Sequence, residues 1–132
     1  MILHIDQNAS VPIYLQIRGQ IVGAIAEGDL KPGDALPSVR RLAADLGVNL
    51  HTVNKSYAVL RDEGYVIVRG RSGAFIADFA EAGSDKTDAG ERRMAESLHG
   101  LVLEHKARGG SAEAFMQCAA DAVRAVFEEG DR

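Results

Sequence analysis

Residues 38–60 read SVRRLAADLGVNLHTVNKSYAVL and hold two short helical patterns separated by a glycine. Apolar residues at helical spacing predict a first helix over residues 39–46, capped by Ser38 and ended by Gly47. Asn49 is a favourable cap for a second helix from Leu50 to about Glu63. Two short helices joined by a three-residue turn that contains glycine predict a helix-turn-helix.

The segments on either side predict that this motif is a winged helix. Upstream, isoleucines at 13, 17, 21 and 25 form an apolar stripe on a helix from about Pro12 to Glu27. Downstream, two β-prone runs, 65–69 and 74–77, flank a glycine-bounded turn at 70–73 and predict a hairpin. The predicted core comprises the isoleucine stripe, Leu36, Leu42, Leu46, Val53, Leu60, Val66, Val68 and Phe75.

The remainder of the chain carries two further helical patterns. Residues 79–90 are rich in Gly, Asp, Ser and Ala and are interpreted as a polar linker. A helix from about Asp88 to Arg108 and another over 112–129, capped by Ser111, follow. We therefore expect a mostly α-helical chain with a small β-hairpin. Its parts are a winged helix-turn-helix domain (1–78), a linker (79–90) and a two-helix dimerisation or effector segment (91–132).

Both C-terminal helices have an apolar stripe at helical spacing. The stripes either pack against each other within one chain or form an interface between two chains. We favour the second interpretation, because a helical hairpin of about 40 residues seldom buries enough apolar surface to be stable alone. The residues predicted to form this dimer interface are Met94, Leu98, Leu101, Phe115, Met116, Ala119, Val123, Val126 and Phe127.

Charge is distributed unevenly along the chain. The net charge is −4, yet residues 38–71 hold six basic and three acidic side chains. Residues 79–132 hold seven basic and eleven acidic side chains, and we expect them to face away from any phosphate backbone. A local excess of basic charge is what a DNA interface requires, whereas the charge of the whole chain is a poor test.

Helix-turn-helix proteins read bases with polar and cationic side chains near the start of the second helix. Asparagine pairs with adenine, and lysine with guanine or phosphate. Arginines in the first turn of the first helix oppose the helix dipole unless a phosphate lies nearby. The alternative is a solvated polar surface, with Gly70 and Gly73 as turn residues of positive φ. The predicted DNA-contacting residues are Ser38, Arg40, Arg41, Asn49, His51, Thr52, Asn54, Lys55, Arg69, Gly70 and Arg71.

Six short runs within residues 10–78 carry a family resemblance. They are PIYLQI (12–17), GDLKPGDALPSVR (28–40), LGVN (46–49), TVNKSY (52–57), EGY (63–65) and GRSGAF (70–75). Together they resemble the DNA-binding domain of the GntR family of bacterial regulators, and the short two-helix C-terminal part resembles its YtrA subfamily. The resemblance implies a homodimer on a palindromic operator, with Arg40, Thr52, Lys55 and the wing around Gly70 in contact with DNA. Arg41 departs from the glutamate that the family often has, so the capping box with Ser38 is absent.

Other classes of function find little support in the sequence. A single cysteine, Cys118, excludes an intramolecular disulfide, fits a reducing cytoplasm and is expected to be a small buried hydrophobe. The four histidines lack metal-ligand spacing, since His99 and His105 fall on different faces of one helix. We find neither a membrane span nor a catalytic motif. We therefore expect a cytoplasmic protein that is not an enzyme and has no cofactor or metal.

The resulting prediction is a sequence-specific transcriptional repressor that binds double-stranded DNA as a homodimer. One alternative is a winged helix that binds protein, which the cationic side chains of the reading helix and hairpin disfavour. A second is a ligand sensor, although two helices do not easily enclose a pocket of the usual size. An unknown small-molecule effector could still bind where two subunits meet.

Overall fold

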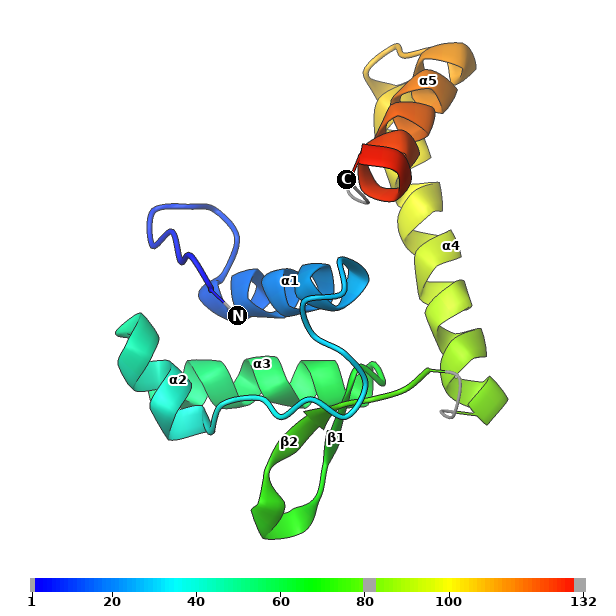
Figure 1. Ribbon diagram of the computed structural model, residues 1–132. Helices are drawn as coiled ribbons and strands as arrows, with labels where there is room; N and C mark the ends of the chain where they lie inside the picture. The colour runs from blue at the N-terminus through cyan, green and yellow to red at the C-terminus, as the bar shows by residue number, and fades with distance from the viewer. Residues whose placement is uncertain (1, 80–82, 130–132) are drawn as a thin grey trace. The chain divides into compact units, whose positions relative to one another are not determined.

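The computed structural model describes residues 2–79 and 83–129. It forms two compact units, Met1–Lys86 and Thr87–Arg132, and confirms a mostly helical chain with one small antiparallel hairpin (Figure 1). The elements in order are α1 (Ile13–Ala26), α2 (Val39–Leu46), α3 (Leu50–Asp62), β1 (Val66–Val68), a 3-10 turn (Gly70–Ser72), β2 (Ala74–Ile76), α4 (Gly83–Ala107), α5 (Ala112–Arg124) and a π-helical turn (Ala125–Glu129).

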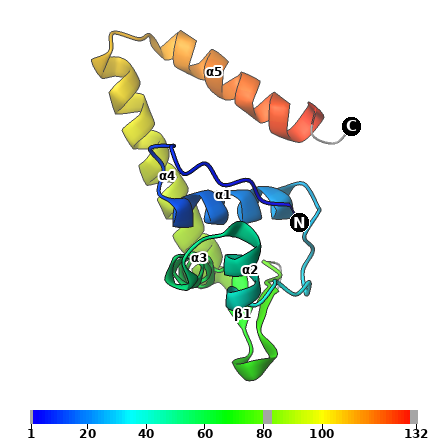
Figure 2. The same cartoon turned by 90° about the vertical axis from the view of Figure 1, so that its left-hand side faces the viewer.

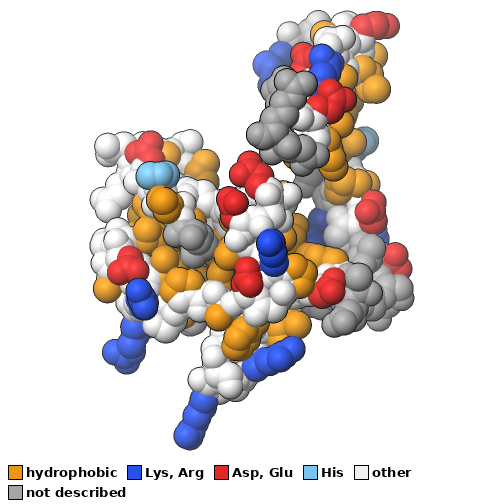
Figure 3. Space-filling view, viewed as in Figure 1, with side chains coloured by type: hydrophobic (Ala, Val, Ile, Leu, Met, Phe, Trp, Pro, Cys, Tyr) orange, Lys and Arg blue, Asp and Glu red, His pale blue; other side chains and the backbone are white. Residues whose placement is uncertain are grey.

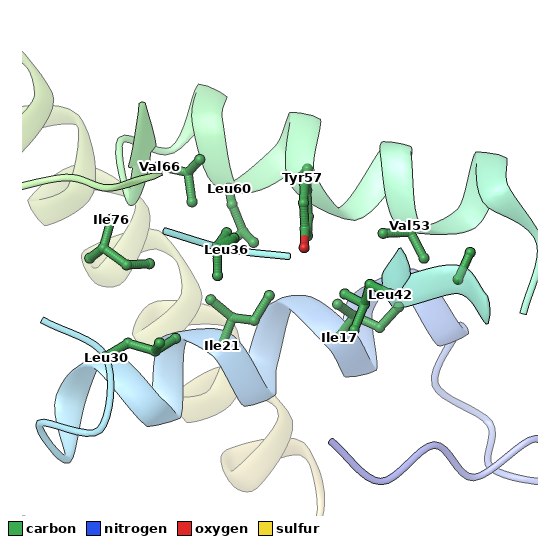
Figure 4. Packing of buried hydrophobic residues seen from close by; sticks show 11 residues of the cluster. Ile17, Ile21, Leu30, Leu36, Leu42, Val53, Tyr57, Leu60, Val66 and Ile76 are labelled. Carbon is green, nitrogen blue, oxygen red and sulfur yellow. The ribbon is translucent and has the colours of Figure 1, made fainter. Parts of the chain in front are cut away.

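The core of the first unit lies where α1, α2 and α3 meet (Figure 4). Ile17 and Ile21 of α1 share one cluster of buried residues with Leu42, Val53 and Leu60. The isoleucine stripe is therefore the core-facing side of α1, as its spacing predicts. Fully burying an aliphatic side chain of this size contributes about 1.5–3 kcal/mol to the stability of the fold.

Two residues of the hairpin that were predicted to lie in the core, Val68 and Phe75, are not buried. Val66 pairs with Ile76, and both are buried, whereas the next pair on that side, Val68 and Ala74, lies nearer the tip. Val68 is exposed and Phe75 is only half-buried. The hairpin extends beyond the core, so only its base is covered.

A third extended segment, residues 33–36, holds the hairpin in place. It was not predicted from the sequence. The backbone amides of Gly33 and Leu36 donate to the carbonyls of Ile76 (2.8 Å) and Ala74 (2.9 Å), and Ile76 N donates to Asp34 O at 2.8 Å. Because these bonds run along the free edge of β2, the hairpin is fastened to the loop that leads into α2.

The N-terminal arm, residues 2–11, is held by two glutamines one turn apart on α1. The Gln20 amide accepts from His4 N (2.8 Å) and donates to His4 O (2.6 Å). The Gln16 amide accepts from Asp6 N (2.9 Å) and donates to Asp6 O (2.8 Å). Each amide therefore satisfies both backbone groups of one arm residue, as a neighbouring strand would.

The helix α4 differs from the prediction at its start. α4 begins at Gly83 rather than near Asp88, so the greater part of the predicted linker 79–90 is helical, while residues 80–82 lie outside the described residues. Composition favoured a linker there, but Ser84 and Asp85 are residue types that favour the first turn of a helix.

Ser56 is a polar residue on the buried face of α3. It shares that face with Val53, Tyr57 and Leu60 and has no solvent-exposed surface. Its hydroxyl has no hydrogen-bond partner among the residues that the structure describes. A buried hydroxyl that lacks a partner carries the cost of its lost hydration.

We therefore expect Ser56→Ala to raise the free energy of unfolding by about 1 kcal/mol, since it removes that cost and alanine favours helix more strongly than serine. Ser38→Ala is the matched control, because the Ser38 hydroxyl caps α2 by accepting from Arg41 N at 3.1 Å, and its loss should lower stability by about 1 kcal/mol. Denaturant unfolding measures both changes. A Ser56→Ala protein less stable than the parent would contradict this account.

Candidate nucleic-acid interface

The first two turns of α3 present polar side chains to solvent. Asn49 caps the helix, its side-chain oxygen accepting from His51 N at 2.7 Å. His51, Asn54 and Lys55 are exposed, and Thr52 is half-buried. The caps and bounds of α2 and α3 agree closely with those predicted from the sequence. Gly47, between the two helices, has a left-handed φ of 68°. This outward face is what a recognition helix requires.

The start of α2 adds two arginines to the same unit. Arg41 forms an i,i+4 ion pair with Asp45 at 3.8 Å, and both side chains are exposed. Arg40 is exposed too and has no ion-pair partner within the described ranges. Such exposed pairs contribute little to stability, so neither arginine is needed to hold the fold.

Tyr57 fixes the segment that leads into α2. Its hydroxyl donates to the carbonyl of Pro37 at 2.8 Å, and burial raises the pKa of that hydroxyl. The bond joins the middle of α3 to the residue before the Ser38 cap. The orientation of the first turn of α2, which carries Arg40, is thereby tied to α3.

The tip of the wing is a tight turn. Gly70 and Gly73 have φ values of 51° and 109°, a conformation that other residues rarely adopt. Between them Arg71 is exposed. Arg69 lies over the Phe75 ring, with its guanidinium carbon 5.8 Å from the ring centroid. Basic side chains stand out around the end of the hairpin in Figure 3.

A groove of about 560 Å³ lies between α3, the start of α2 and the wing. Ser38, Asn54 and Arg71, all predicted from the sequence, line it together with Arg61. Arg61 was not predicted, because it lies near the end of α3, away from the first turns where base-reading side chains are expected. Arg69 lines a separate hollow on the other side of the hairpin, beside Pro32 and Ile67. Strand alternation would put residues two apart on one face. The turn at Gly70, which follows the end of β1, therefore separates Arg69 from Arg71.

Comparison with known proteins identifies the family to which the chain belongs. The model of the gntR family of bacterial regulatory proteins matches residues 13–76. The chain is 40% identical over 106 residues to the HTH-type transcriptional repressor YtrA of Bacillus subtilis (strain 168), covering 77% of each protein. The chain belongs to the GntR family.

Solved structures agree with this assignment. YtrA from Sulfolobus acidocaldarius, a GntR-family transcription factor, is 40% identical and matches 79% of this chain and 99% of that chain with a TM-score of 0.64. A transcriptional antiterminator from Listeria monocytogenes EGD-e is 27% identical over 96% of this chain and 92% of its own, with a TM-score of 0.81. The AraR(DBD) structure in complex with operator ORX1 is 25% identical over 58% of this chain and 96% of that chain, with a TM-score of 0.52.

These relatives are regulators and not enzymes. This GntR protein is accordingly a DNA-binding transcriptional regulator. In the part of the chain that the structure describes, no helix is long and apolar enough to cross a membrane, and no cluster of three or more His, Cys, Asp or Glu side chains could hold a metal ion.

The second unit of this GntR protein leaves its apolar stripes uncovered. None of the side chains described at 88–128 is buried. Phe115 and Ala119 are half-buried, and the other residues predicted for the dimer interface are exposed, up to 67% for Met116 and 70% for Phe127. α5 diverges from α4 at the connecting turn (Figure 2). Packing between the two helices of one chain therefore does not account for the stripes.

The turn between α4 and α5 is closely built. The His105 ring contacts Gly110, where a Cβ atom would collide with it, and a ring nitrogen lies 2.8 Å from Ser111 O. The same ring meets Phe115 edge-on, with centroids 5.5 Å apart. Ser111 caps α5 as expected, accepting from Ala114 N at 3.1 Å. Cys118, expected to be buried, is exposed, because the stripe beside it has no cover within the chain.

Proposed function

We propose that this GntR protein is a homodimeric repressor that binds a palindromic operator through α3, the start of α2 and the wing. The observation that carries the proposal is the groove in which these three elements meet. Polar and cationic side chains from each of them, Ser38, Asn54 and Arg71, line it. Such side chains suit a phosphate strand and the adjacent base edges.

The interface divides into reading and positioning residues. Asn49, His51, Thr52, Asn54 and Lys55 belong to the first turns of α3, and we assign them to the major groove. Ser38 caps α2, and Arg40 and Arg41 lie in its first turn. These residues suit backbone phosphates, as do Gly70 and Arg71 at the wing tip. Arg69 stacks on Phe75 away from the groove, so we assign it a lesser part than Arg71.

Arg40→Ala and Lys55→Ala should each weaken binding to a mixed-sequence DNA duplex at low salt. Each lost phosphate contact should also lower the dependence of log affinity on log salt by about one unit. Lys106→Ala, which removes an exposed cation of α4 outside the proposed interface, is the control and should bind as the parent does. Salt-titrated fluorescence anisotropy measures all three. Unchanged affinity in both interface variants would contradict the contact assignment.

Dimerisation is proposed from the uncovered stripes of the second unit. An apolar surface of this extent is costly in water unless a partner covers it. We propose that a second copy of this chain covers these stripes, because a symmetric pair of DNA-binding domains matches the symmetry of a palindromic operator. The chain's relative YtrA is named a repressor, and a dimer that occupies a promoter excludes polymerase from it.

Val123→Glu should convert the dimer to a monomer, since it places a charge in the proposed interface. Val123 is 57% exposed in the single chain, so the fold of the monomer should survive. Ala114→Glu is the matched control: it adds the same charge to α5 about 180° around the helix. Analytical ultracentrifugation of the full chain measures the outcome. A Val123→Glu dimer, or a parent protein that sediments as a monomer, would contradict the proposal.

The same variants test the operator. Selection from a pool of randomised duplexes should enrich an inverted repeat with the parent and with Ala114→Glu, but a single half-site with Val123→Glu. The selected site placed in a reporter promoter then tests the sign of regulation. Repression predicts lower reporter output when the chain is present, and higher output would show an activator instead.

A further inference from the structure

Lys55 is held by an aromatic ring from another helix. Its ammonium nitrogen lies 4.1 Å from the centroid of the Tyr14 ring, within the range of a cation–π contact. Tyr14 belongs to the first turn of α1 and is half-buried, whereas Lys55 is exposed. The contact joins two helices, α1 and α3, whose buried residues belong to the core of the unit. Tyr14 lies outside every site described above.

We propose that Tyr14 is a positioning residue that holds the Lys55 ammonium ready for DNA. The inference rests on the proposed function, because it concerns how one residue of that interface is presented. It extends the functional surface from the helix-turn-helix and wing to the start of α1.

The kind of partner matters for this role. Arg18 and Arg41 lie against carboxylates, Glu63 and Asp45, at 2.8 and 3.8 Å. A carboxylate fixes a cation but also neutralises it. The Tyr14 ring fixes Lys55 through its quadrupole and leaves the full positive charge available to a phosphate or a guanine.

A lysine benefits from such support, because its long side chain loses rotamer freedom when it binds. A lysine that the free protein already restrains loses less freedom in the complex, and this preorganisation increases affinity. Tyr14 is half-buried, and it lies one turn before Ile17, which is fully buried, on the same helix. The core therefore fixes the backbone that carries the Tyr14 ring.

Tyr14→Leu should weaken binding to the mixed-sequence duplex by about two- to fivefold, which is the value of an exposed cation–π contact expressed as affinity. Tyr14→Phe keeps the ring and should bind as the parent does. In a Lys55→Ala background, Tyr14→Leu should cause no further loss, because the two residues act through one contact.

An NMR chemical shift of the free protein tests the contact between Tyr14 and Lys55 without DNA. The ε-methylene protons of Lys55 should resonate upfield of ordinary lysines through the ring current of Tyr14, and Tyr14→Leu should abolish the shift while Tyr14→Phe keeps it. Thermal unfolding of each variant checks that the fold is intact.

Several outcomes would overturn the inference. They are a Lys55 resonance without the upfield shift, a Tyr14→Leu protein that binds as well as the parent or better, and a Tyr14→Phe protein as weak as Tyr14→Leu, which would make the hydroxyl the active group. Additive losses in the double variant would do so too. If Lys55→Ala alone leaves affinity unchanged, the proposed DNA contact of Lys55 fails first; if it weakens binding while Tyr14→Leu does not, only this inference fails.

Discussion

The packing of α1 against α3 is the interaction on which the first unit depends. Ile17 and Ile21 meet Val53 and Leu60 in one cluster, and none of the four has exposed surface (Figure 4). A cluster of this kind supplies a large part of the few kilocalories per mole by which a small domain is stable. At its edge, Arg18 donates to both oxygens of Glu63 at 2.8 and 3.0 Å, and that hydrogen bonding raises the pKa of the guanidinium.

Because α3 is held on one side by α1, its other side is free to carry polar residues. The parts around it are fastened by specific bonds: Tyr57 holds the Pro37 carbonyl, and the loop over 33–36 pairs with β2. The helix α3, the start of α2 and the wing therefore form one preorganised surface. Rigid presentation lowers the ordering cost of binding, and the role that we propose for the contact between Lys55 and Tyr14 rests on the same argument.

Local signals made much of this predictable from sequence. Ser38 and Asn49 are strong caps, Gly47 is a strong terminator, and the isoleucine stripe has a clear period, so α1, α2 and α3 fall close to where they are expected. Bonds between distant segments leave no periodic trace. The Gln16 and Gln20 clamp on the N-terminal arm, the third segment beside β2 and the Arg18–Glu63 pair were missed for this reason. The start of α4 was misplaced because glycine and serine there resemble a linker in composition.

For the candidate site, the exposure of most of the proposed residues could be predicted from the sequence, whereas their arrangement could be predicted less well. Exposed polar positions of α3 follow from helical period alone, whereas the separation of Arg69 from Arg71 depends on how the hairpin turns at Gly70. In the second unit, period identifies the apolar stripes, but only the structure shows that one chain leaves them uncovered.

The most direct test is an amide NMR map of the full chain during titration with a mixed-sequence DNA duplex at low salt. The account predicts that the largest shift changes fall at residues 38–41, 49–55 and 70–73, with little change along 98–124. Largest changes on α4 and α5, with the first turns of α3 unaffected, would contradict it.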